Sequence, residues 1–250
     1  MKLQYSSDLH LEFLNNPGDK EFEELIIPSA DYLILAGDIC TISKIETLDK
    51  FLSYCVERFK VVIYIPGNHE YYSTSISEGN KLLKEICNKY RVRLLNPGIT
   101  VIDDITIVGC TLWSHISYVN EETIEYSITD FSVISNHTIE SQNELHQREK
   151  DFLLNIINER KCLIITHHAP DRNLVKINAL FKYAADLSEA FGTNITQEFK
   201  SENILGWIYG HSHRNREKTI NGIKLYTNQR GYSKEFTETK YSESKVLELP

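Results

Sequence analysis

The sequence is poor in the features that would indicate an exported or disulfide-linked protein. Its five cysteines are odd in number and include no CxxC pair. A disulfide framework is therefore not expected, and free thiols are typical of a reducing compartment. No apolar run approaches the ~20 residues that cross a bilayer, and no basic segment followed by an apolar one comes after Met1. We expect a cytoplasmic protein without a membrane anchor or a signal peptide.

Positive charge is also scarce. Lysine and arginine number 27 against 35 aspartates and glutamates, which gives a net charge of −8. A protein that grips duplex DNA by its phosphates needs the opposite balance, so stable binding of duplex nucleic acid is not expected. A small phosphate-bearing substrate remains compatible, because bound cations can reverse the local field. The length of 250 residues suits one large α/β domain over residues 1–250.

Short β-branched or aromatic runs alternate with segments of helical spacing in the first 110 residues. The runs predict strands at residues 2–6, 32–36, 61–65, 91–95, 100–102 and 105–110. Apolar residues three and four apart predict helices at 44–58 and 77–88, and residues 15–24 are polar enough to form a surface loop. Asp103 and Asp104 suit a tight hairpin turn. Strands that alternate with helices are typical of α/β layering.

The second half is less regular. Residues 117–141 mix acidic, hydroxyl and aromatic residues without strong periodicity, so we expect an excursion at about residues 115–142 that serves as a lid or cap. A helix is then predicted at 143–159 and a strand at 162–165. Residues 171–197 form another mixed segment with a short helix near 187–191. Further strands are expected at 204–209, 224–227 and 245–249.

Polar side chains that can bind metals or protons follow five of these apolar runs. They are Asp8 with His10, Asp38, Asn68 with His69, His167, and His211 with His213. Any one of them alone is more often a turn residue, a helix cap or a satisfied histidine. Five such groups at strand ends in one chain favour convergence, because open α/β sheets bind their ligands at the carboxyl ends of the strands.

Metal binding explains the residue types. Aspartate, asparagine and neutral histidine suit manganese, iron, zinc or nickel better than calcium. None of the five groups contains a cysteine, which argues against a closed thiolate zinc site. One carboxylate between two cations can bridge them, about 3.5–4 Å apart, as in two-metal phosphoryl-transfer sites. If Asp8 to His10 and His211 to His213 are extended, the first and third side chains of each triplet point the same way.

The ordered blocks resemble those of the calcineurin-like metallophosphoesterase family, in particular small bacterial phosphoesterases and phosphodiesterases. The blocks are DLH at residues 8–10, GD at 37–38, GNHE at 67–70, THHAP at 166–170 and GHSH at 210–213. The resemblance implies an α/β fold, a four-layer αββα sandwich of two mixed β-sheets flanked by helices. It also implies two divalent or trivalent transition metal ions, with manganese and iron favoured over zinc and nickel.

The same resemblance assigns roles to matching positions. The first metal would be held by Asp8, His10 and His213, and the second by Asn68, His167 and His211, with Asp38 bridging both. His69 would be the general acid or a cationic phosphate contact, and the attacking group would be a metal-bound hydroxide. His168, beside the expected ligand His167, would lie behind the ligands or face the substrate. Arg214 and Arg230 are further candidates for substrate binding, Arg230 also for support of the ligands.

Several functions are compatible with these blocks. We expect a phosphodiesterase acting on a small soluble substrate of the nucleotide type. A phosphomonoesterase or protein phosphatase, an exonuclease and an inactive scaffold of the same fold are the alternatives, although a scaffold would be expected to lack a ligand or the proton donor. Glu70 is expected to bond a histidine or a backbone amide, and Tyr71 and Tyr72 to wedge their loop. The remaining histidines match no block and are expected on the surface, namely His115, His137 and His146.

Overall fold

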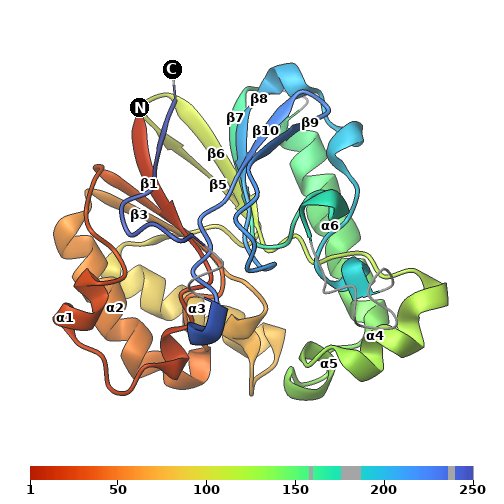
Figure 1. The fold of residues 1–250 in the computed structure, drawn as a ribbon, viewed down its shortest axis with the longest axis horizontal. Coiled ribbons are helices and arrows are strands. Elements are labelled where there is room, and N and C mark those ends of the chain that lie inside the picture. Colours follow the sequence, from red (N-terminus) through yellow and green to blue (C-terminus); the bar gives the residue numbers. More distant parts are fainter. Residues whose placement is uncertain (158–159, 176–186, 236–239, 250) are drawn as a thin grey trace.

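The computed structural model describes residues 1–157, 160–175, 187–235 and 240–249 (Figure 1). One sheet has five strands in the order β11-β1-β2-β3-β4, and the other has six in the order β5-β6-β7-β8-β10-β9. The strands of the first sheet are β1 (Lys2–Ser6), β2 (Tyr32–Ala36), β3 (Val61–Ile65), β4 (Arg93–Leu94) and β11 (Val246–Glu248). Those of the second are β5 (Gly98–Ile102), β6 (Ile105–Cys110), β7 (Cys162–Thr166), β8 (Ile204–Ile208), β9 (Lys218–Ile220) and β10 (Ile223–Tyr226).

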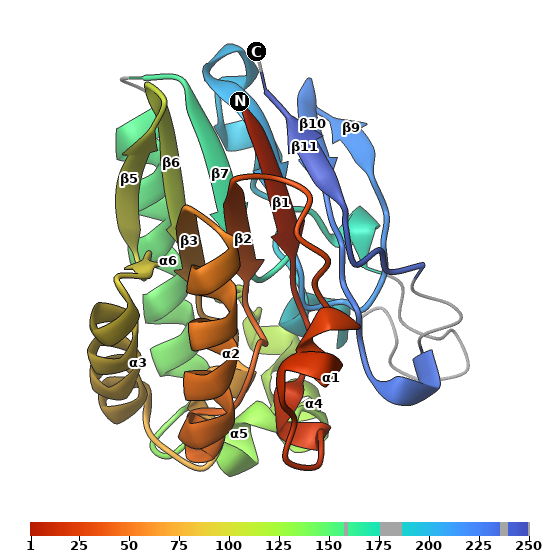
Figure 2. The same cartoon turned by 90° about the vertical axis from the view of Figure 1, so that its left-hand side faces the viewer.

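Helices cover the outer face of each sheet. The helices are α1 (Asp19–Glu23), α2 (Ile45–Arg58), α3 (Ile76–Tyr90), α4 (Glu121–Ser127), α5 (Asp130–Val133) and α6 (Ile139–Ile157). The first three lie on the first sheet and α6 lies on the second (Figures 1 and 2). No helix within the described ranges is both long and apolar enough to cross a membrane.

Alternating side chains hold the layers together. In β2, Leu33 and Leu35 belong to the apolar cluster on the helical side, which also contains Leu48 of α2. Ile34 and Ala36 belong to a second cluster that includes Ile165 of β7, in the other sheet. Because successive strand residues face opposite sides, each central strand contributes to both cores. The predicted four-layer αββα sandwich of two mixed sheets is confirmed.

Strand direction brings the loops of interest to one edge. β1, β2, β3 and β4 run parallel to one another, as do β6, β7, β8 and β10. The antiparallel strands lie at the margins of the sheets, with β11 beside β1, β5 beside β6 and β9 beside β10. The carboxyl ends of the parallel strands therefore point the same way, downward in Figure 2.

Several elements differ from the sequence predictions, and the larger differences concern α1, β9 and α6. The loop expected at residues 15–24 contains α1, since Phe22 is buried in the core and Gly18 donates its backbone N–H to Glu21 at 2.9 Å. β9 was not predicted, because it has only three residues. It pairs with β10. Helix α6 begins at Ile139 rather than at residue 143, because Thr138 and Ser141 bond each other's backbone N–H at the helix start. Its expected end, at residues 158–159, lies outside the described residues.

The excursion at residues 115–142 contains α4, α5 and the beginning of α6. The surface position expected for His137 and His146 is wrong. His137 is 5% exposed and its ring stacks on Phe131 at 5.3 Å, and His146 is 2% exposed and donates from Nδ1 to the Trp113 carbonyl at 2.5 Å. The ring of His137 also lies 4.8 Å from that of Trp113, which joins the excursion to the main body, while His115 is exposed as expected.

Candidate metal centre

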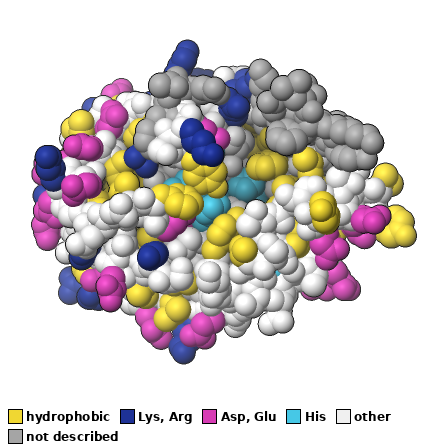
Figure 3. Space-filling model, turned by 60° about the horizontal axis from the view of Figure 1, so that its bottom comes forward, with side chains coloured by type: hydrophobic (Ala, Val, Ile, Leu, Met, Phe, Trp, Pro, Cys, Tyr) yellow, Lys and Arg dark blue, Asp and Glu magenta, His cyan; other side chains and the backbone are white. Residues whose placement is uncertain are grey.

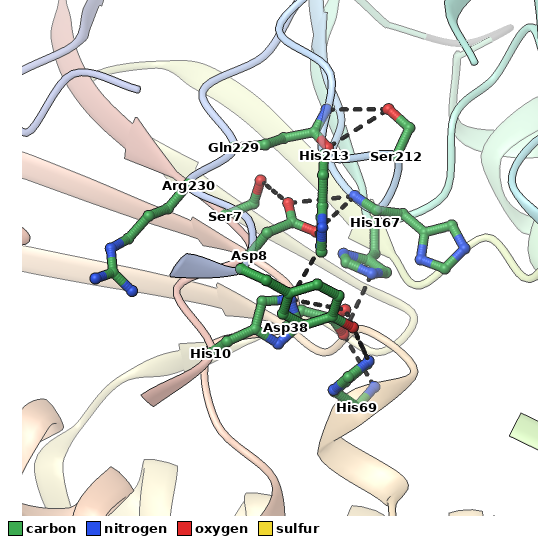
Figure 4. A network of polar contacts seen from close by, with 12 residues as sticks. Ser7, Asp8, His10, Asp38, His69, His167, Ser212, His213, Gln229 and Arg230 are labelled. Atoms are coloured by element: carbon green, nitrogen blue, oxygen red, sulfur yellow. Dashed lines mark hydrogen bonds and ion pairs between the residues drawn. The ribbon is translucent and has the colours of Figure 1, made fainter. Parts of the chain in front are cut away.

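The carboxyl ends of β1, β2, β3, β7 and β8 bring the candidate ligands together (Figure 4). Two groups could each hold a metal ion, and within each group the ligand atoms lie within 4.8 Å of one another. One group is Asp8, His10, Asp38 and His213, and the other is Asp38, His167 and His211. Asp38 is common to both groups, so one carboxylate lies between two potential cation sites.

The two oxygens of the Asp38 carboxylate face different groups. Oδ1 accepts the backbone N–H of His69 at 2.9 Å and lies 3.2 Å from Nε2 of His167. Oδ2 lies 3.9 Å from Nε2 of His10. The same His167 nitrogen lies 3.2 Å from Oδ1 of Asn68, which places Asn68 with the second group. A carboxylate that bridges two ions needs this orientation.

The chemistry of the donors fits metal ions. Nε2 of His10 and Nε2 of His213 face each other at 3.0 Å, and Asp8 Oδ1 lies 3.4 Å from the latter. Nδ1 of His211 is buried and has no hydrogen-bond partner among the described residues. Buried polar atoms normally have partners, so an unpartnered nitrogen beside facing imidazoles and carboxylates suits a cation.

The backbone around the ligands is unusual. Asp8, His10, Asp38, His211 and His213 all have left-handed φ values, between 49° and 72°. The extended geometry expected for the two triplets is therefore wrong, and tight turns, not strand alternation, direct these side chains inward. Non-glycine residues in this conformation cost free energy and cluster at functional sites.

Glycine is required where the blocks meet. Gly37 has a φ of +86°, and a Cβ there would collide with the ring of His167. A Cβ on Gly67 would collide with the carboxylate of Asp38. The glycines that precede Asp38 and Asn68 thus let the ligands approach the neighbouring loops.

Carboxylates that the sequence did not single out orient the imidazoles. Glu12 accepts hydrogen bonds from Nδ1 of both His10, at 3.0 Å, and His69, at 3.1 Å. Glu235 accepts one from Nδ1 of His213 at 2.7 Å. Such bonds fix the tautomer and leave Nε2 of each ring available. Glu12, His10 and His69 also form a third potential metal-binding group.

A residue of the excursion reaches the site as well. Asp130, at the start of α5, is 5% exposed and accepts hydrogen bonds from Nδ2 of Asn68 at 2.9 Å and from the Tyr72 hydroxyl at 2.7 Å. The bond to Nδ2 directs the amide oxygen of Asn68 toward His167. The excursion therefore contributes to the orientation of a candidate ligand.

Glu70 connects two of the blocks, as expected. Its carboxylate accepts the backbone N–H groups of Asp38 at 3.0 Å, Ile39 at 2.7 Å and Gly67 at 2.7 Å. Burial, together with the nearby charge of Asp38, raises the pKa of Glu70 to about 7. In the adjoining loop, the ring of Tyr72 stacks on His69 at 4.0 Å.

A cavity of about 440 Å³ opens in front of the candidate ligands. Asp38, His211 and His213 line one side of it, and residues 127–130 of the excursion line another. Figure 3 shows the face of the molecule that lies at the bottom of Figure 1. Histidines lie there at the bottom of a hollow with hydrophobic side chains around it. A substrate in this cavity would contact both metal groups' ligands and the excursion.

The three candidates for substrate binding lie in different places. Arg214 lines the cavity. Arg230 donates to the Leu9 carbonyl at 3.0 Å and points away from the histidines (Figure 4). His168 is buried behind His211, with 4.1 Å between the ring centroids, and its Nδ1 faces the Thr111 carbonyl at 3.4 Å. Burial lowers the pKa of His168 to about 3, so its ring is neutral at physiological pH.

Nearby charges raise the pKa of two histidines in the cluster against the effect of burial. Burial lowers the pKa of His167, but the ionised Asp38 beside it and their hydrogen bond help to raise it to about 9. Burial also lowers the pKa of His213, whereas hydrogen bonds with Asp8 and Glu235 raise it to about 10. The histidines in turn hold the pKa of Asp38 well below its ordinary value, against the effect of burial. Protons on these imidazoles therefore occupy the places that cations would take.

Metal binding near pH 7 should release about two protons per chain, because His167 and His213 must become neutral to act as ligands. Affinity for Mn²⁺ should rise with pH up to the folded pKa values of about 9 and 10. Without ions, the stabilisation from these raised pKa values is fully present below the ordinary pKa of 6.5 and is lost as pH rises through 9 and 10. Titration calorimetry in buffers of different ionisation enthalpy counts the protons. Binding without proton release would contradict this ligand set.

Comparisons with known proteins agree with this geometry. A family model described as calcineurin-like phosphoesterase matches residues 3–215. A protein of Acanthamoeba polyphaga mimivirus, described as uncharacterized protein L509, is 34% identical over 93% of this chain and 92% of its own length. The structure of phosphopantetheinyl hydrolase (PptH) from Mycobacterium tuberculosis matches with a TM-score of 0.76 at 21% identity, over 97% of this chain and 94% of that one. A dimetal phosphatase from Danio rerio matches with a TM-score of 0.56 at 12% identity, over 92% and 87%.

Proposed function

Because this chain belongs to the calcineurin-like phosphoesterase family and is thus a hydrolase of phosphoester bonds, we propose that it is a dinuclear phosphodiesterase for small nucleotide-type substrates. The observation that carries the proposal is the position of Asp38. Its two carboxylate oxygens face two separate groups of histidines and oxygen ligands, and each group is large enough to hold one ion.

The residues divide between two ions around this carboxylate. Asp8, His10 and His213 would hold the first, and Asn68, His167 and His211 the second, with Asp38 shared between them. The donor set favours manganese or iron, with zinc and nickel as further candidates. When bound, two such ions would lower the pKa of a water molecule and neutralise charge on the phosphoryl group.

His69 would supply a proton to the leaving oxygen. It lines the cavity, is 7% exposed, and donates from Nδ1 to Glu12 at 3.1 Å. Burial lowers the pKa of His69, but Asp38 and Glu12 outweigh burial and raise the pKa above its ordinary value. Nε2 of the ring lies 3.2 Å from the Tyr232 hydroxyl, and a proton on this nitrogen would be available to a substrate oxygen in the cavity.

The charge of the cavity favours a diester over a monoester. Outside the proposed ion sites, two carboxylates line it, those of Asp130 and Glu235, whereas Arg214 is the one lysine or arginine among its described lining residues. A diester carries one negative charge at its phosphate and a monoester carries about two near pH 7. The cavity therefore suits the less charged diester.

The excursion at residues 115–142 serves as the cap of the cavity, on the side that residues 127–130 line.

Hydrolysis of bis-p-nitrophenyl phosphate and p-nitrophenyl phosphate by the purified protein with Mn²⁺ tests the proposal. The expected result is a higher kcat/KM for the diester and no turnover after removal of metal by a chelator. Faster hydrolysis of the monoester would favour a phosphatase. No turnover of either compound by protein with both ions bound would favour an inactive scaffold, and release of nucleotides from single-stranded DNA would indicate an exonuclease.

A further inference from the structure

The cavity in front of the candidate ligands has two unlike sides. The side formed by Asp38, His211 and His213 is polar. The other side, here called the apolar wall, consists of Ile128, Val175, Ala190 and Phe191. The candidate metal ligands explain the polar side. Nothing in the proposed chemistry at the phosphorus atom needs the apolar wall.

The apolar wall is supported from behind. Ala190 belongs to a small apolar cluster with Ile116 and Ile124 of the excursion, and Ile128 and Phe191 pack against the same cluster. Phe191 is also held through its backbone, because its carbonyl accepts the N–H of Ala169 at 3.2 Å. Packing of Ile128, Ala190 and Phe191 against this cluster restricts their side chains, which reduces the entropic cost of binding.

The apolar wall begins next to the metal centre. The ring centroids of Phe191 and His211 are 5.0 Å apart, with an angle of 31° between the planes. Ile128, Val175 and Phe191 are each partly exposed, so they present apolar surface to the cavity. A group attached to a phosphate at the metal centre would reach this surface directly.

Charge limits what the apolar wall can accept. Its four side chains carry no charge, and among the described residues that line the cavity outside the metal groups the charged ones are Asp130, Arg214 and Glu235. A second phosphate placed against these four side chains would meet apolar surface without a cation, and burying an unpaired charge is costly. A neutral apolar or aromatic group would instead lose water-exposed surface, which is favourable.

We propose that the apolar wall binds a neutral, apolar or aromatic ester group of the substrate, so that the enzyme selects phosphodiesters with such a group over those with a charged group at that position. This inference rests on the proposed phosphodiesterase activity for its catalytic consequence. The binding preference itself depends only on the apolar wall and the ions.

Two diesters with the same leaving group distinguish binding at the apolar wall from an effect on the hydrolysis step. Bis-p-nitrophenyl phosphate retains an aryl ester group and methyl p-nitrophenyl phosphate retains a methyl group. Phe191→Ala should lower kcat/KM about tenfold for the aryl diester and leave the methyl diester nearly unchanged, with metal content unaltered. Phe191→Leu should recover part of the loss. Val119→Ala is the matched control, since Val119 is 87% exposed on the same excursion.

Equal losses on both diesters would overturn the inference, because Phe191 would then act only by supporting His211. No loss on either would overturn it as well. Binding of phenylphosphonate and methylphosphonate to the Mn²⁺-loaded protein, measured by calorimetry, gives a second readout. Phenylphosphonate should bind about tenfold more tightly, and Phe191→Ala should remove that difference. If no ester were hydrolysed but this difference remained, the proposed function would fail and the inference would stand, whereas equal binding would overturn the inference.

Discussion

Asp38→Ala should remove both metal ions and reduce hydrolysis on the order of 10³-fold or more, since ion-based charge stabilisation is worth several kcal/mol. The reason is that Asp38 belongs to both metal-binding groups, with one oxygen toward His167 and the other toward His10. Removing any other ligand should weaken mainly one ion. Metal content by plasma mass spectrometry, measured together with kcat/KM, checks this expectation.

The control for this variant is Asp151→Ala, on the exposed face of α6, which should keep both ions and full activity. Loss of folding is monitored by thermal unfolding and far-ultraviolet circular dichroism. An Asp38→Ala protein that folds and retains two ions, or that loses only one, would show that Asp38 is not shared between them.

His69→Ala should leave the metal content nearly unchanged and reduce turnover about 10²–10⁴-fold, the usual range for a general acid. The loss should be small for p-nitrophenolate, which leaves readily without a proton, and large for an alkoxide leaving group. Glu12→Gln should show the same dependence on the leaving group in a weaker form, because Glu12 holds Nδ1 of His69. A series of diesters with leaving groups of different pKa measures this dependence.

His115→Ala is the matched control, because His115 is exposed on the excursion and lies outside the candidate metal-binding groups. A His69→Ala protein that kept full rate on the poorest leaving group would contradict the role of general acid. Loss of an ion in that variant would instead favour the group of Glu12, His10 and His69 as a metal site.

The sequence was sufficient to locate every described strand except β9 and to name the candidate ligands. Each ligand block follows a short apolar run such as Val61–Ile65, and parallel strands of one sheet end at the same edge, which brings together the blocks that follow strands of that sheet. The two-sheet sandwich came from the family resemblance of the blocks rather than from periodicity. The role of Glu70 could also be predicted, because Glu70 lies within the GNHE block. In the structure it accepts the backbone N–H of Asp38, as expected.

The supporting residues could not be derived in this way. Asp130 reaches Asn68 only because the excursion folds back over the site, and the sequence of residues 117–141 has no periodicity that shows this. Glu235 lies 22 residues after the histidine that it contacts, in a segment without a motif. Glu12 offered one signal, its position two residues after His10, but only the left-handed turn at His10 brings the carboxylate under the imidazole.

Diffraction data from crystals of the Mn²⁺-loaded protein, collected above and below the manganese absorption edge, test the two-ion centre most directly. The expected result is two anomalous peaks on opposite sides of the Asp38 carboxylate. One should lie among Asp8, His10 and His213, and the other among Asn68, His167 and His211. A single peak, or peaks that leave Asp38 uncoordinated, would contradict a shared carboxylate at the centre of this site.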